Sequence, residues 1–161
     1  MQPSVWLSTG WKAEPMKADN NAKRYLQQVR HCDLRISAKF EELERLKALV
    51  TKITSSPKRD AVSGGGSQDK LSEAVAKIVD LEAEINREID FYIDARKRVT
   101  KTIDKVDDAK LQSVLIMRYI QFKTFEQIAA DMHYTYRWVC MMHGMALQVV
   151  EKIIGSEKSS F

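Results

Sequence analysis

Residues 111–147 read LQSVLIMRYIQFKTFEQIAADMHYTYRWVCMMHGMAL and are the most informative part of the chain. Its apolar residues recur every three or four positions, which predicts short amphipathic helices. The first helix is expected to end at residues 118–120, and the second to begin at Thr124 and end at residues 133–134. Thr135 is placed to cap a third helix. Two short helices joined by a tight turn are typical of a helix-turn-helix, which places its second helix in the major groove of DNA.

Each helix of this predicted motif has one apolar face. Ala129 is small at the point where the two helices must approach closely, and we expect His143 and Gly144 to serve close packing of the third helix. The remaining residues predicted to be buried are Phe125, Ile128, Met132, Trp138, Val139, Met142, Ala146 and Leu147. A bundle that serves packing alone is the alternative interpretation of the same pattern.

Two long segments before this stretch also have helical periodicity. In the first, apolar residues recur at three- and four-residue steps through Ala22, Leu26, Val29, Ile36, Phe40, Leu43 and Val50. In the second, from Lys70 to Val106, a near-heptad seam runs through Leu71, Val75, Ile78, Leu81, Ile85, Ile89, Tyr92, Val99 and Ile103. Residues 54–69 between them contain Pro57 and the run Gly64–Gly66, so they predict a flexible loop.

A long helix with a single apolar stripe must bury that stripe against another helix. We therefore expect a long antiparallel helical hairpin over residues 18–106, serving dimerisation or docking of a partner. A small helix-turn-helix unit follows over residues 107–154, with Asp107–Asp108 offering its first cap, and residues 155–161 form a tail. The predicted fold class is all-α.

Residues 1–17 have no periodicity and contain Pro3, Gly10 and Pro15, so we expect a disordered N-terminal extension. Helical character begins after Met16. We expect Met16 to be the biological start, with the first fifteen residues an upstream extension or an expression remnant.

Composition bounds the class of protein. Charged residues make up 30% of the chain and hydrophobic residues 44%, as in soluble helical proteins. The formal charge of +4 permits a nucleic-acid partner without requiring one. With two distant cysteines, no apolar run long enough for a membrane helix and no secretory signal, the chain is expected in the cytoplasm.

Catalytic and metal-binding patterns are not found. No Gly-rich phosphate loop, HExxH motif or nucleophilic triad is present in the sequence. Cys140 and His143 have C-x-x-H spacing, and His31 and Cys32 add two ligand types, but these pairs fall on helices expected to be apart. We expect a protein that is not an enzyme and that holds no metal and no cofactor.

The motif residues also carry a family resemblance. The pattern LIMRYI…KTFEQIAADMHYTYRWV…AL (residues 115–147) resembles region four of bacterial sigma factors, whose helix-turn-helix recognises a promoter element. From Met16 the chain resembles small phage and prophage proteins of Gram-positive bacteria, some similar to late-gene transcription activators. NAKRYLQQVRHCDLRI (21–36), SSPKRDAV (55–62), VDLEAEIN (79–86) and HGMAL (143–147) carry this resemblance. It implies double-stranded DNA and bacterial RNA polymerase as partners.

The same resemblance implies a DNA-contacting surface at the start of the third helix. The residues expected there are Thr135, Tyr136, Arg137, Cys140, Met141 and Met145, with Lys123 and Thr124 from the helix before. The chain departs from the family pattern, because related proteins tend to have arginine near the positions of Met141 and Met145. The segment from Asp107 to Phe161 contains six basic and six acidic residues, so this unit has no net charge.

A neutral unit lacks much of the phosphate attraction that supplies affinity for DNA. Dimerisation, tethering by RNA polymerase or a basic patch on the long helix could compensate. That patch consists of Arg96, Lys97, Arg98, Lys101 and Lys105, whose alternative interpretation is a solvated helix face.

The expected function is a sequence-specific transcription regulator. One rival is a protein-interaction module that binds RNA polymerase or another protein without touching DNA, since methionine-rich faces suit adaptable protein contacts. Another is a DNA-packaging factor resembling a terminase small subunit, for which a ring-shaped oligomer would be expected.

Overall fold

The chain is all-helical in the residues that its structure, a computed structural model, describes: 19–55 and 66–158. In chain order the elements are α1 (Asp19–Ser55), α2 (Gly66–Ile103), α3 (Ala109–Leu115), a π-helical turn η1 (Ile116–Ile120), α4 (Phe125–Met132) and α5 (Tyr136–Lys158). The all-α prediction is confirmed. Within the described ranges, no helix combines the length and apolar character needed to cross a membrane. The predictions for residues 1–17, for the middle of the 54–69 loop and for residues 159–161 lie outside these ranges.

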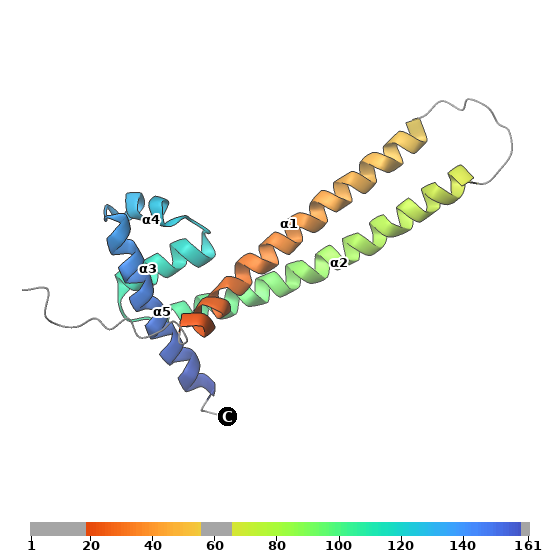
Figure 1. Ribbon diagram of the computed structural model, residues 1–161. Coiled ribbons are helices and arrows are strands. Elements are labelled where there is room, and N and C mark those ends of the chain that lie inside the picture. The colour runs from red at the N-terminus through yellow and green to blue at the C-terminus, as the bar shows by residue number, and fades with distance from the viewer. Residues whose placement is uncertain (1–18, 56–65, 159–161) are drawn as a thin grey trace, which may run out of the picture.

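The two long helices lie side by side and run in opposite directions (Figure 1). Ion pairs give the register: Arg35 pairs with Glu88 at 3.0 Å, and Lys47 pairs with Glu82 at 3.3 Å. In the half distant from the rest of the molecule, the buried cluster between the helices contains only Leu43, Leu81 and Ile85. The distal halves of the two helices therefore bury few apolar side chains against each other.

The main core lies where the other half of the hairpin meets the short helices (Figure 1). It joins Leu26 and Val29 of α1, Val99 and Ile103 of α2, and one stripe of α5. Its fully buried members from the C-terminal part of the chain include Val114, Leu115, Ile128, Val139, Met142 and Val150. A single core thus unites the base of the hairpin with α3, α4 and α5.

Polar contacts reinforce this junction. The backbone N–H of Ala22, in the first turn of α1, donates to the carboxylate of Glu151 on α5 at 2.8 Å. A carboxylate is favoured at the N-terminal end of a helix, so Glu151 caps α1 from a distant part of the chain. The hydroxyl of Tyr25 lies 2.9 Å from that of Thr102, which ties α1 to α2.

The connection between α3 and α4 has an unusual backbone. Asp108 caps α3 by accepting from the N–H groups of Lys110 and Leu111, as predicted. After η1, Phe122 adopts a left-handed conformation with φ 58°, which is strained for a residue with a side chain. Its ring lies 5.3 Å from the guanidinium of Arg30 on α1, so this turn also packs on the hairpin.

Several predicted boundaries were wrong. The predicted 54–69 loop is too long, because α1 continues to Ser55 and α2 begins at Gly66. Asp69 in the first turn of α2 favours this start, and glycine costs little at a helix end. The tail predicted from residue 155 was also wrong at its start, since α5 continues to Lys158.

Parts of the predicted core were wrong as well. Phe40 and Val75 are exposed. In this part of the hairpin each long helix packs against the other alone, and both side chains lie beside that contact. Cys32, Ala74 and Ala95 are buried instead. Gly144 serves no close approach, since a Cβ built there would meet nothing within 4 Å.

The cap on α1 gives a first test. We expect Glu151→Ala to lower the free energy of unfolding by about 1–2 kcal/mol, because the N–H of Ala22 loses its charged acceptor. Glu157→Ala, on the same helix, removes only the exposed ion pair with Lys105 and should cost less than about 0.5 kcal/mol. Chemical denaturation of both variants measures the difference; equal costs would show that the cap does not stabilise the junction.

Candidate nucleic-acid interface

The start of α4 is fixed by a reciprocal cap. The hydroxyl of Thr124 accepts from the N–H of Gln127 at 3.3 Å, and the Gln127 side chain accepts from the N–H of Thr124 at 2.9 Å. Both contacts belong to a capping box, which sets where the helix begins. The predicted cap at Thr124 is confirmed. Its hydroxyl also hydrogen-bonds the carboxylate of Glu126, so it is used within the fold.

The turn into α5 follows at once. His133 ends α4 in a left-handed conformation with φ 56°, and the N–H of Tyr134 donates to Ala129 at 3.0 Å. The hydroxyl of Thr135 then accepts from the N–H of Trp138 at 3.2 Å, so Thr135 caps α5 as predicted. Ala129 is buried in the angle between the two helices. The turn therefore holds α4 and α5 in a fixed mutual orientation.

Part of the predicted DNA-contacting surface comes together on one exposed face of α5. Arg137, Met141 and Met145 follow each other at four-residue spacing and are all exposed. A surface hollow of about 660 Å³ is lined by Thr135, Arg137, Trp138 and Met141. We call these four residues together with Met145 the α5 face.

Trp138 was predicted to be buried, and this was wrong. Its side chain is 44% exposed on the α5 face. The buried stripe of α5 runs through Val139, Met142, Ala146 and Val150, and Trp138 falls one position outside it. The spacing of that stripe was the available signal in the sequence.

Tyr136 and Cys140 do not join this hollow. The ring of Tyr136 packs edge-on against Phe125 of α4, with centroids 6.3 Å apart. A hydrogen bond with Cys140 raises the pKa of Tyr136 above its ordinary value. These two residues thus form a separate contact beside α4.

Most cations between α3 and α5 already interact with other groups of the fold. Lys123 forms an ion pair with Asp131 at 2.7 Å, which neutralises a predicted contact residue. Arg118 donates to the carbonyl of Lys123 at 2.9 Å and lies over the ring of Phe125. Among the described residues, no carboxylate forms an ion pair with Arg137. Arg137 is therefore the cation that the α5 face presents to a partner.

The basic patch predicted on α2 divides into separate parts. Arg96, Lys97 and Lys101 surround one hollow of about 440 Å³ together with Ile93, Thr100 and Asp104. Arg98 lines a different hollow between α1 and α2, and Lys105 pairs with Glu157 of α5. Three of the five predicted phosphate contacts thus share a surface.

Behind the α5 face lies a partly buried histidine. His143 has its Nε2 2.9 Å from the hydroxyl of Tyr119, and its ring packs against Phe125 with centroids 5.0 Å apart. Burial lowers the pKa of His143 to about 4, and the charges of Arg118 and Lys23 add to the shift. His143 was predicted to serve helix packing, and its ring packs between helices. In the described part of the chain, no three His, Cys, Asp or Glu side chains are grouped as metal ligands.

This histidine gives a pH dependence. In the unfolded chain its imidazole takes up a proton near pH 6.5, whereas in the fold it stays neutral down to about pH 4. Acidification therefore favours unfolding, and the free energy of unfolding should fall by about 1.3 kcal/mol between pH 7 and 5.5. We expect His143→Gln to be less stable at pH 7 but to lose this dependence of the free energy of unfolding on pH. The control His31→Gln, on the exposed side of α1, should keep the pH dependence. Denaturant melts at both pH values measure the slope; a slope that persists in His143→Gln would contradict the assignment.

Comparison with known proteins identifies a family. No curated protein and no solved structure matches the chain significantly. A family model described as "Protein of unknown function (DUF1492)" matches residues 52–150. This range includes all of α2, α3 and α4 and most of α5, and it covers more than half of the chain. The chain therefore belongs to the DUF1492 family of proteins of unknown function.

Proposed function

We propose that the chain is a sequence-specific DNA-binding transcription regulator, similar to phage late-gene activators, that acts at promoters with host RNA polymerase. The observation that carries this proposal is the exposed Arg137 in the first turn of α5, directly after a capped helix–turn junction. In a helix-turn-helix, the first turns of the second helix meet the edges of the bases. The hairpin then serves to join copies or to dock on polymerase.

The α5 face offers chemistry suited to base edges. The guanidinium of Arg137 can donate two hydrogen bonds to guanine or bind a phosphate. Trp138 and Met141 supply apolar surface that suits the methyl group of thymine. The hydroxyl oxygen of Thr135 accepts from the N–H of Trp138, and its O–H is still able to donate to a phosphate.

The charge of this unit limits its affinity. With Lys123 paired to Asp131, a single turn of α5 supplies few phosphate contacts. Specific binding then depends on added contacts, from the Arg96–Lys101 surface of α2, from a second copy or from polymerase at the same promoter. We therefore expect weak binding by one isolated copy.

A second candidate function has its own supporting observation. Trp138, Met141 and Met145 are all large, apolar and exposed on one face. Such a face suits a protein partner such as RNA polymerase, because methionine adapts to varied surfaces and tryptophan anchors interfaces. This function would need no contact between Arg137 and DNA.

The response to salt separates the two functions. Fluorescence anisotropy of the full chain with tiled promoter fragments from its genomic neighbourhood should show one bound fragment. Affinity should fall steeply with salt, with a slope of about −0.9 in log K per phosphate contact. Arg137→Ala should weaken binding by about 10–100-fold through loss of a bidentate contact. The control Arg45→Ala, which removes an exposed cation of the distal hairpin, should leave binding unchanged.

Other outcomes have definite meanings. Weakening by Arg45→Ala equal to that by Arg137→Ala would show attraction by overall charge rather than by α5. No binding to any fragment at low salt would contradict DNA recognition. Purified RNA polymerase would then be the partner to test, with Trp138→Ala as the variant expected to lose it.

A further inference from the structure

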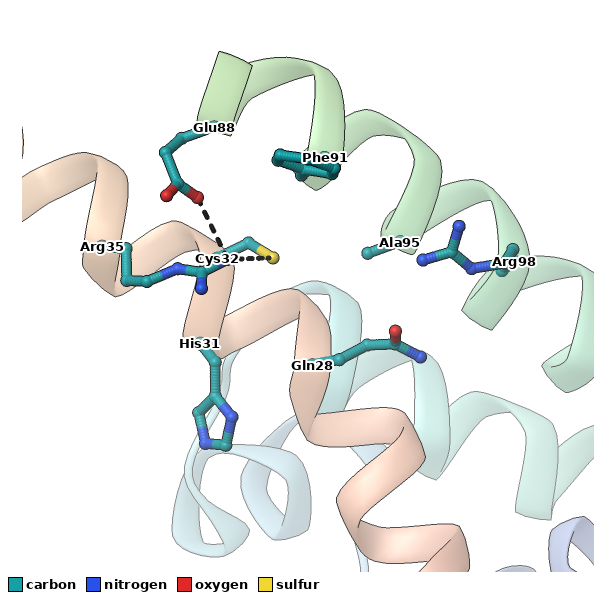
Figure 2. A pocket seen from close by; sticks show the side chains of 8 residues that line it. All are labelled: Gln28, His31, Cys32, Arg35, Glu88, Phe91, Ala95 and Arg98. Carbon is teal, nitrogen blue, oxygen red and sulfur yellow. Dashed lines mark hydrogen bonds and ion pairs between the residues drawn. The ribbon is translucent and has the colours of Figure 1, made fainter. Parts of the chain in front are cut away.

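The two long helices enclose hollows at two levels of the hairpin. Nearer the base, a hollow of about 480 Å³ lies between Cys32 and Arg35 of α1 and Glu88, Phe91 and Ala95 of α2 (Figure 2). Nearer the tip, a second hollow of about 290 Å³ is mainly apolar. It is lined by Leu46, Leu49, Ile53 and Ala74, with Lys70, Glu73 and Lys77 also at its wall.

Both hollows open on one face of the hairpin. Steps of three, four or seven residues return to the same side of a helix. On α1 these steps connect Gln28, Cys32, Arg35, Lys39, Leu46, Leu49 and Ile53, and on α2 they connect Ala74, Lys77, Glu84, Glu88, Phe91 and Ala95. Between the hollows, Lys39 and Glu84 form an ion pair across the two helices. We call this face, from the base hollow to the tip hollow, the hairpin groove.

A protruding ring and an empty apolar hollow lie on the same groove. Phe91 is 61% exposed, the largest exposed fraction among the large hydrophobic side chains of the described residues. Leu49 at the tip hollow is 47% exposed. The groove thus carries both a large apolar group and an apolar hollow that such a group can fill.

We propose that a second copy of the chain packs on the hairpin groove in antiparallel orientation. Phe91 of each copy then enters the tip hollow of the other, and two hairpins form a four-helix bundle. Phe91 lies one turn from the Arg35–Glu88 pair, beside Cys32, so the two-fold axis of this arrangement lies midway between Cys32 and Leu49, near residues 40–41 of α1. A two-fold axis at that level brings the Phe91 ring of each copy onto the tip hollow of the other. A parallel arrangement would instead place the two Phe91 rings together and leave both tip hollows open.

Charge also favours a second copy on this face. A two-fold interface must be complementary to itself, and the groove carries the cations Arg35, Lys39 and Lys77 beside the anions Glu73, Glu84 and Glu88. The Arg96–Lys101 surface, on another side of α2, groups three cations around one hollow. Two such surfaces would repel each other.

The groove is also large enough. From Gln28 to Ser55, α1 is about 42 Å long, and two helices side by side are about 20 Å wide. The product of this length and width is close to the ~800 Å² that each partner buries in a stable interface.

The mass of the full chain in solution tests the proposal. Sedimentation equilibrium should give a dimer of the 18.5 kDa chain. Phe91→Ser should raise the dimer dissociation constant by about 100-fold, because each dimer loses two buried rings. Val79→Ser is the matched control: Val79 is 59% exposed on a different side of α2, so the variant should dimerise normally. Circular dichroism should show unchanged helix content in both.

A cross-link then tests the orientation. In the variant with Phe91→Cys and Leu49→Cys, oxidation should join position 91 of one copy to position 49 of the other, as mapped by mass spectrometry. A monomer at all concentrations, an assembly larger than a dimer, a 91–91 link or equal weakening by Val79→Ser would each overturn the proposal. The test involves no DNA, so its failure would leave the proposed role of α5 unaffected.

Discussion

Burial of one face of α5 against the base of the two long helices is the interaction on which the rest of the structure depends. Val139, Met142, Ala146 and Val150 are fully or almost fully buried, and they share a core with the hairpin. Full burial of a valine or methionine side chain contributes about 1.5–3 kcal/mol. Because that core is continuous, the α5 face is held in a fixed direction relative to the hairpin. Glu151 strengthens the same junction by capping the first turn of α1.

The two ends of the molecule expose different kinds of surface. At the base, capped short helices present Arg137 beside exposed apolar side chains, a mixture that suits base edges or a protein surface. Toward the tip, the two helices share a thin seam and leave an apolar hollow open. A dimer through the hairpin groove would bring two α5 faces into one assembly, and linked contacts would compensate for the small charge of each.

Local features of the fold were predictable from sequence, while burial that depends on distant neighbours was not. Asp108, Thr124 and Thr135 were predicted as caps and are caps, since a cap depends on residues two or three positions away. Trp138 was misplaced because it lies one position outside the stripe of Val139, Met142, Ala146 and Val150, and only the spacing of that stripe signalled its exposure. The left-handed Phe122 and the cap from Glu151 had no local signal, because a turn against Arg30 and a contact to Ala22 are set by the tertiary fold.

Hydrogen exchange of the full chain tests the continuous core most directly. We expect buried amides at the base of α1 and α2 and in α5, such as those of Val29, Val99 and Val139, to open together with the same high free energy. Amides of the distal halves, around Leu43 and Leu81, should open at lower free energy when the protein is monomeric. Opening of α5 while the base of the hairpin stays protected would show two independent units and contradict the account.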